Sequence, residues 1–269
     1  MFKIGWFSTG RDRMACELLK VVYESIEKKE IKNSAICFVF SNRERGESKF
    51  SDEFFKVVDE LNIPLICFSS RKFKPDMRKK ALNEEKEGNS KLIKKWRSLY
   101  DEVIMRQIKP YPVDLILLAG YMLILGEKFC QEYKIINLHP SAPGGPKGTW
   151  QEVIWQLIEK KATQSGIMMH LVTPLLDAGP PLTYCKFSIR GERFNPLWKK
   201  MEKKLKDKSL KQIKKEEGEN EPLFKAIREQ GVKRELPLIV NTLKFLAEGK
   251  IKLKEMEKTR PICLNFLDV

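Results

Sequence analysis

The stretch Leu115-Ile-Leu-Leu-Ala-Gly-Tyr-Met-Leu-Ile-Leu-Gly126, with Ile135-Ile-Asn-Leu-His-Pro-Ser141 after it, sets the architecture expected for this chain. Its two apolar, β-branched-rich runs, separated by a brief amphipathic segment, predict a strand, a helical crossover and a second, parallel strand. Asn137 and His139 lie two residues apart, so their side chains leave the second strand on the same face, and Pro140 ends that strand. Because ligands bind at the carboxyl ends of strands in open parallel sheets, this amide and imidazole form the candidate active centre.

Strands and helices alternate along the rest of the chain, which predicts one α/β unit with a C-terminal appendage. We expect a loop with a partly exposed helical insertion in the lysine-rich segment 71–108, and helical or partly mobile chain at 190–220. A terminal hairpin is expected from residues 250–254 and 261–267. Further strands are expected at residues 2–7, 35–40, 64–68, 166–172 and 183–189, and helices near 15–26, 52–61, 150–158 and 222–249.

The composition indicates a soluble globular protein. A chain of 269 residues with 42% apolar residues can form one large α/β domain or two small ones around a proper core. Its formal charge of +15 and pI near 9.4 favour anionic partners. Nucleic acid, a membrane surface and small phosphate or carboxylate ligands all satisfy that condition, and charge alone does not choose among them.

Cysteine usage and hydropathy indicate the compartment. The six cysteines are scattered, with no C-x-x-C or Cys/His pairing, which fits neither a zinc site nor a disulfide framework. The N-terminus enters an apolar strand without a basic leader, and no segment reaches about 18 uninterrupted apolar residues. We therefore expect a cytoplasmic protein that is neither secreted nor inserted into a membrane.

The opening of the chain offers a candidate anion site. The segment Ser8-Thr-Gly-Arg-Asp-Arg13 joins the first strand to the first helix. A helix start presents free backbone N–H groups, and Arg11 and Arg13 add positive charge. An ordinary strand-to-helix turn explains the same residues, so both interpretations stay open at this point.

Only two histidines occur in the sequence, His139 and His170, and both lie at or beside the ends of expected strands. An imidazole that titrates near neutral pH can move protons, and the amide N–H of Asn137 can stabilise an oxyanion. The turn 173–180 places Asp177 in a constrained loop, where its carboxylate can fix a tautomer or pass protons through water. Amide, imidazole and carboxylate together suit acyl transfer to an amine.

Three motifs carry a resemblance to a known family: Asn137-Leu-His-Pro-Ser141, Leu118-Ala-Gly-Tyr-Met-Leu-Ile-Leu125 and Leu176-Asp-Ala-Gly-Pro180. With them the chain resembles the folate-dependent formyltransferases, most of all the glycinamide ribonucleotide formyltransferases. The resemblance implies a Rossmann-like formyltransferase fold, with a mostly parallel sheet, helices on both faces and a C-terminal helix plus hairpin appendage. Residues 1–190 would form the catalytic core, and residues 191–269 an extension packed on the same domain.

The resemblance also implies site residues and a donor, 10-formyltetrahydrofolate, with no metal. In this comparison Asn137 holds the formyl oxygen, His139 acts as acid and base on the tetrahedral intermediate, and Asp177 organises proton traffic. The donor would lie against Met122, Leu123, Ile124, Leu125, His170, Val172, Thr173 and Asp177.

Three departures from the family pattern concern substrate binding. Thr9-Gly-Arg-Asp-Arg13 stands where the family has a glycine- and asparagine-containing loop for the acceptor's phosphate, and Leu123 replaces an arginine. Val232, followed by Lys233 and Arg234, stands where the ribonucleotide enzymes carry a glutamate for ribose hydroxyls. We expect the acceptor to contact Gly10, Arg11, Asp12 and Arg13, with the two arginines binding phosphate by charge.

The leading hypothesis is formyl transfer to a primary amine, glycinamide ribonucleotide in de novo purine synthesis. Alternatives with the same centre are a formyltetrahydrofolate hydrolase and a transferase acting on an amino sugar nucleotide or another amine. From other classes come a basic nucleic-acid-binding protein on this scaffold and a metal hydrolase using His139, His170 and Asp177. We expect small anionic substrates and neither a membrane nor a nucleic acid as partner, and leave open a monomer or homodimer.

Overall fold

A mixed sheet runs through the computed structural model, which describes residues 1–258 and 260–266. Within these residues the sheet has eight strands in the order β3-β2-β1-β4-β5-β6-β7-β8. The strands are β1 (Phe2–Phe7), β2 (Ser34–Ser41), β3 (Leu65–Cys67), β4 (Leu115–Leu118), β5 (Ile135–His139), β6 (Gln164–Leu171), β7 (Pro181–Ser188) and β8 (Ile262–Cys263).

The first five strands are parallel, as the alternation of strands and helices predicted. The chain moves outward from β1 through β2 to β3, returns to pair β4 with the other side of β1, and continues to β5. The strand order therefore reverses between β1 and β4, the kind of switch point where α/β proteins bind ligands. β6 then runs antiparallel to both β5 and β7.

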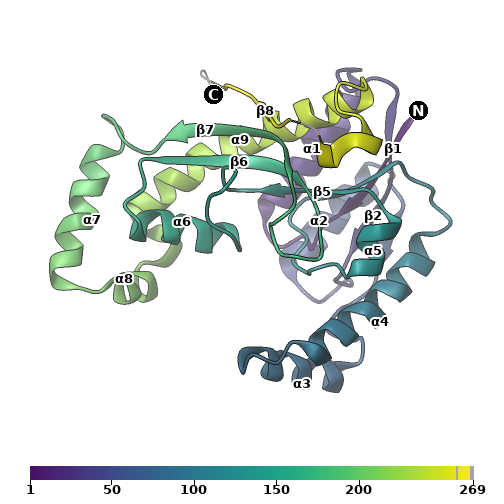
Figure 1. Cartoon of the computed structure of the whole chain (residues 1–269), viewed down its shortest axis with the longest axis horizontal. Helices are drawn as coiled ribbons and strands as arrows, with labels where there is room; N and C mark the ends of the chain where they lie inside the picture. The colour runs from purple at the N-terminus through teal and green to yellow at the C-terminus, as the bar shows by residue number, and fades with distance from the viewer. Residues whose placement is uncertain (259, 267–269) are drawn as a thin grey trace.

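Helices cover both faces of this sheet (Figure 1). Alternate side chains of β1 point to opposite faces: Trp6 joins the core under α1, α2, α6 and α9, whereas Phe7 joins the core under α4 and α5. The helices are α1 (Arg13–Glu27), α2 (Lys49–Glu60), α3 (Pro75–Lys86), α4 (Lys91–Ile108), α5 (Glu127–Glu132), α6 (Trp150–Glu159), α7 (Asn195–Asp207), α8 (Leu210–Glu216) and α9 (Pro222–Ala247), with 3-10 turns η1 (Gly218–Asn220) and η2 (Leu253–Lys258).

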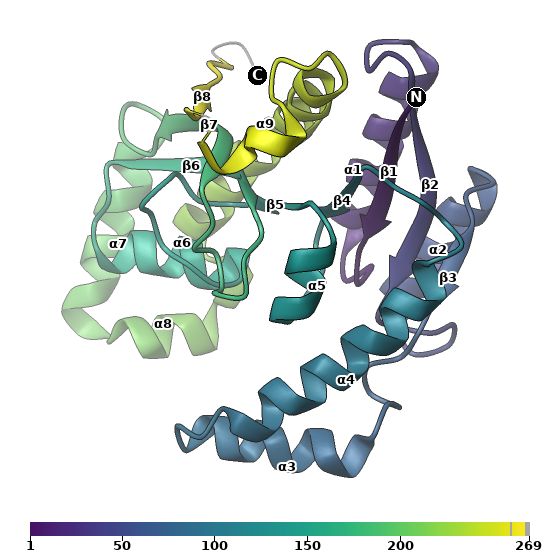
Figure 2. The same cartoon turned by 45° about the vertical axis from the view of Figure 1, so that its right-hand side comes forward.

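The lysine-rich segment 71–108, expected to be a loop with a partly exposed helical insertion, is helical over most of its length. It forms α3 and α4, which extend together from the body of the molecule (Figure 2). Aromatic packing explains the difference: Trp96 of α4 stacks on Tyr100, which stacks on Phe68 at the end of β3, with 5.1 Å between ring centroids in each pair. The inward face of α4 is therefore core, and only its outward face is the solvated surface that the charges suggested.

The C-terminal region differs from the prediction in one element. Residues 190–220 contain α7, α8 and η1, and α9 spans most of the helix expected at 222–249. The expected terminal hairpin is wrong, because the chain after α9 enters η2 and β8 then pairs in parallel with β7. Burial explains this, since Ile251 and Met256 pack into the core beside α9. Leu267, the last residue of that expected hairpin, lies outside the described residues.

Every helix within the described ranges is too short or too polar to cross a lipid bilayer.

Candidate active site

The three sequence-predicted catalytic side chains meet at the carboxyl end of β5. Asn137 and His139 leave β5 on one side, and His170 of β6 lies directly opposite Asn137 in the antiparallel register. The loop that follows β6 returns Asp177 toward both rings, with its carboxylate oxygens 3.5 Å from His139 Nδ1 and 3.7 Å from His170 Nε2. Residues distant in sequence thus form one cluster in which both imidazoles are 2% exposed.

His170 fixes the orientation of the Asn137 amide. Its Nδ1 lies 2.9 Å from the Leu171 carbonyl oxygen, which can only accept, so Nδ1 carries the proton. With the proton on Nδ1, the Nε2 lone pair lies 3.1 Å from Asn137 Nδ2 and accepts one of its hydrogens. The second Nδ2 hydrogen is left to donate to a ligand, and His170 acts on the site through Asn137.

His139 is held neutral beside a carboxylate. Its Nε2 donates to the Pro146 carbonyl oxygen at 3.0 Å, so the lone pair of the neutral ring is on Nδ1, facing Asp177. Burial lowers the pKa of His139, and Asp177 offsets that effect only in part. A proton that arrives on Nδ1 therefore meets a carboxylate placed to stabilise the imidazolium.

Asp177 is ionised and held in a turn. Burial raises the pKa of Asp177, but the His170 and His139 rings and the Gly148 N–H together lower it by more, so its net pKa lies below the ordinary value. The Gly148 N–H donates to Oδ2 at 3.1 Å. The backbone of Asp177 is left-handed, with φ of 46°, a conformation that Asp tolerates better than most residues. A Cβ on nearby Gly179 would lie 1.7 Å from the Leu171 carbonyl oxygen, so only glycine fits where the loop crosses β6.

These side chains open into a cavity of about 400 Å³. Its lining includes all three candidate catalytic residues. It also includes every residue expected to hold the donor: Met122, Leu123, Ile124, Leu125, His170, Val172, Thr173 and Asp177. The expected donor-side wall is the loop between β4 and α5, and most of it is apolar, which suits a flat heteroaromatic ring.

The loop between β1 and α1 forms another part of the wall. Arg11 and Asp12 line the cavity, whereas Gly10 and Arg13 are absent from its lining. Asp12 is the N-cap of α1, and its Oδ1 accepts the Ala15 N–H at 3.2 Å. The start of α1 therefore already has a carboxylate of its own.

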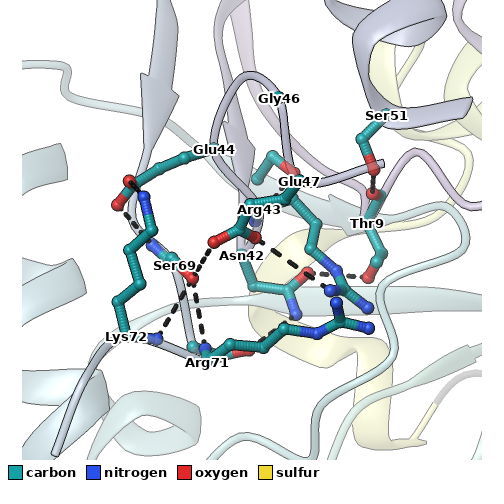
Figure 3. A network of polar contacts seen from close by, with 12 residues as sticks. Thr9, Asn42, Arg43, Glu44, Gly46, Glu47, Ser51, Ser69, Arg71 and Lys72 are labelled. Atoms are coloured by element: carbon teal, nitrogen blue, oxygen red, sulfur yellow. Dashed lines mark hydrogen bonds and ion pairs between the residues drawn. The ribbon is translucent and has the colours of Figure 1, made fainter. Parts of the chain in front are cut away.

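A polar network fixes this loop from behind (Figure 3). Thr9 Oγ1 donates to Asn42 Oδ1 at 2.7 Å and accepts the Met122 N–H at 3.0 Å, while Ser51 Oγ donates to the Thr9 carbonyl oxygen. Thr9 is 2% exposed, and it joins the β1–α1 loop to the donor-side loop. One buried hydrogen-bond network therefore supports both of these walls of the cavity.

Comparison with known proteins identifies the family. A family model described as formyl transferase matches residues 17–213. The phosphoribosylglycinamide formyltransferase of Dictyostelium discoideum is 33% identical over 171 residues, which make up 60% of this chain and 73% of that protein. This chain belongs to the formyl transferase family.

Other relatives match over shorter spans. The phosphoribosylglycinamide formyltransferase of Escherichia coli (strain K12) is 33% identical over 95 residues, 35% of this chain and 44% of that enzyme. The match therefore spans less than half the length of that relative. Family membership makes the chain a formyltransferase, which favours the enzyme interpretation over a nucleic-acid-binding scaffold.

Solved structures show the same fold. The glycinamide ribonucleotide transformylase 1 of Symbiobacterium toebii has a TM-score of 0.64 at 16% identity, covering 93% of this chain and 89% of that one. The phosphoribosylglycinamide formyltransferase of Coxiella burnetii has a TM-score of 0.61 at 20% identity, covering 92% and 88%. The expected Rossmann-like formyltransferase fold is confirmed.

The part of the cavity wall formed by α9 contains a charged pair that sequence reasoning missed. Arg228 and Glu235 of α9 line the cavity and form an ion pair, and the Arg228 guanidinium lies over the Trp150 ring, 4.6 Å from its centroid. The sequence pointed instead to Val232 and its neighbour Arg234, but Arg234 is absent from the cavity lining and donates to Gln230. The available signal was the seven-residue spacing, which places Arg228 and Glu235 two turns apart on one helical face.

Within the described residues of the formyltransferase, no group of three His, Cys, Asp or Glu side chains is arranged to hold a metal ion.

Proposed function

We propose that this formyltransferase moves the formyl group of 10-formyltetrahydrofolate to the primary amine of glycinamide ribonucleotide. The observation that carries the proposal is the convergence of Asn137, His139 and Asp177 on one cavity beside the apolar loop 119–125. The acceptor comes from the relatives, which are named phosphoribosylglycinamide formyltransferases. The identity of the donor is inferred from the family that the three sequence motifs indicate.

The proposed reaction begins with attack of the acceptor's nitrogen on the formyl carbon. The new C–N bond places negative charge on the formyl oxygen, and the free Nδ2 hydrogen of Asn137 donates to it. The attacking nitrogen becomes positive and loses a proton to neutral His139, and Asp177 stabilises the imidazolium. The same proton passes to N10 of the donor as its bond to the formyl carbon breaks, which restores neutral His139 and releases tetrahydrofolate.

Release of deformylated folate, followed by absorbance, tests the proposal. Purified protein is mixed with 10-formyltetrahydrofolate with and without glycinamide ribonucleotide. The proposal expects release that depends on the ribonucleotide and disappears in His139→Ala, while that variant still binds the folate. Glu102→Gln serves as control, because the half-exposed Glu102 side chain of α4 forms an ion pair with Lys128 outside the cavity lining. Release without acceptor would replace transfer by hydrolysis, and near-normal turnover in His139→Ala would remove His139 from the mechanism.

A second acceptor class is favoured by Asp12. Its carboxylate caps α1 at the position where the family pattern provides for the acceptor's phosphate, and two negative groups at one helix start repel each other. A primary amine without a phosphate ester fits this wall better. Glycinamide riboside, compared with the ribonucleotide, separates the two classes: a higher kcat/KM for the riboside would establish the second. Asp12→Ser should then raise kcat/KM for the ribonucleotide and leave the riboside unchanged.

We also propose that the protein works in the cytoplasm. All six cysteines are free thiols, as a reducing compartment would keep them: Cys16, Cys37, Cys67, Cys130, Cys185 and Cys263.

A further inference from the structure

The donor-side loop is attached to the protein at both ends, and the far attachment is a buried carboxylate. At the near end, Thr9 N donates to the Gly120 carbonyl oxygen at 3.1 Å, and Thr9 Oγ1 accepts the Met122 N–H. At the far end, Asp101 of α4 accepts the Gly126 N–H on Oδ2 at 2.6 Å. Asp101 is 3% exposed and lies outside the cavity lining. The proposed formyl-transfer steps therefore do not explain why a carboxylate is buried at this position.

The contact at Gly126 leaves no spare room. A Cβ at this residue would lie 2.9 Å from Asp101 Oδ2, although its φ of −77° is open to any residue. Glycine is therefore needed here for the approach of the carboxylate, not for the backbone conformation. Leu125, the residue before it, is 2% exposed and lines the cavity, so the attachment is one residue from the donor wall.

We propose that Asp101 is a positioning residue that holds loop 119–126 in the shape that binds the folate donor. The inference rests on the proposed function for the identity of the ligand, but not for the attachment itself. Trp96 and Tyr100 of α4 are buried in an aromatic stack, so the carboxylate connects the loop to a well-packed helix. Through Asp101, the segment 71–108 would support the loop that lines the active site.

The groups that face Asp101 come from three elements. Arg97 and Tyr100 lie on its own helix, Tyr121 on the loop, and Cys130 on α5. Arg97 is shared with Glu85, whose carboxylate lies 3.1 Å from its guanidinium, so it compensates Asp101 only in part. Burial raises the pKa of Asp101 to about 7, while the Gly126 N–H and Arg97 oppose the rise. The strength of the attachment should therefore change near neutral pH.

Two variants separate the hydrogen bond from the charge. Asp101→Ala removes the acceptor and should weaken binding of 5-formyltetrahydrofolate, a non-reactive analogue, by roughly 5- to 50-fold, with little change in kcat at saturating donor. Asp101→Asn keeps an acceptor oxygen without the charge and should bind the analogue about as tightly as the protonated wild type, more tightly than Asp101→Ala. Wild-type binding should weaken from pH 8 to pH 6 toward that of Asp101→Asn, as protonation removes the charge-assisted bond, whereas binding by Asp101→Asn should be constant.

Hydrogen exchange of the loop amides gives a readout that needs no ligand. Residues 119–126 should exchange faster in Asp101→Ala than in the wild type, while β4 and β5 stay protected, and Glu102→Gln should change nothing. Unchanged exchange and unchanged affinity in a folded Asp101→Ala protein would overturn the proposal, as would equal loss of affinity in Asp101→Asn. If the wild type does not bind the analogue, the proposed function fails, and faster exchange would still support the attachment.

Discussion

Replacing Asp101 by asparagine should stabilise the protein, and by an amount that grows with pH. The side chain is 3% exposed, and burial raises its pKa from the ordinary 3.8 to about 7. Between these values the folded protein holds a proton that the unfolded chain releases, so the free energy of unfolding falls as pH rises. The full gap of about three pKa units corresponds to about 4 kcal/mol, since each unit is about 1.4 kcal/mol.

Between pH 5 and pH 8 the free energy of unfolding of the wild type should fall by about 2–3 kcal/mol through this proton linkage. Asp101→Asn does not titrate, so its stability relative to the wild type should increase by that amount across the window. Urea unfolding followed by tryptophan fluorescence at several pH values measures the difference. Glu102→Gln, a change at the half-exposed neighbour on α4, should follow the wild type within about 0.5 kcal/mol. A constant difference between Asp101→Asn and the wild type would refute the reasoning, because the carboxyl would then be ionised throughout.

Further predictions concern the centre and the α4 core. Asn137→Ala should lower kcat by about 10²- to 10³-fold through loss of the oxyanion donor, and an unchanged kcat in steady-state assays would contradict that role. Because burial lowers the pKa of His139, the acidic limb of kcat/KM should lie below pH 6.5, its ordinary value. In Asp177→Asn the limb should move to still lower pH, since the carboxylate no longer stabilises the imidazolium; a move toward neutral pH would reverse the assignment. Trp96→Ala should cost about 3–5 kcal/mol in the free energy of unfolding, visible as a lower Tm, because the ring is 1% exposed and stacked on Tyr100.

The sequence predicted the parts of the site that depend on local periodicity. Asn137 and His139 share a face because they lie two apart on a strand, and the carboxyl end of a parallel strand faces the ligand crevice. The extent of β5, from Ile135 to His139, follows from the same apolar run that ends at Pro140. The loop carrying Asp177 was recognisable as a constrained turn, and the structure places that residue in the left-handed region.

The parts that the sequence did not predict depend on contacts between distant elements. Nothing near Asp101 in the chain indicates that it meets Gly126, because that contact requires the packing of α4 against α5. The ion pair of Arg228 and Glu235 has a helical spacing, but only the packing of α9 beside α6 shows that this face lines the cavity. The prediction of a C-terminal hairpin was wrong for the same reason, since the burial of Ile251 outweighed local strand propensity.

The net charge of +15 is not concentrated in the cavity. The cavity lining has four carboxylates, on Asp12, Glu152, Asp177 and Glu235, against two guanidinium groups, on Arg11 and Arg228. Arg228 is paired with Glu235, which leaves Arg11 as the cation of the lining without an ion-pair partner among the described residues. The positive excess therefore lies outside the cavity, where it accelerates encounter with any anion and selects none. We propose that selection of the acceptor depends on the balance between Arg11 and Asp12 at the start of α1, so that these adjacent residues, and not the overall charge, decide whether a phosphate ester is accepted.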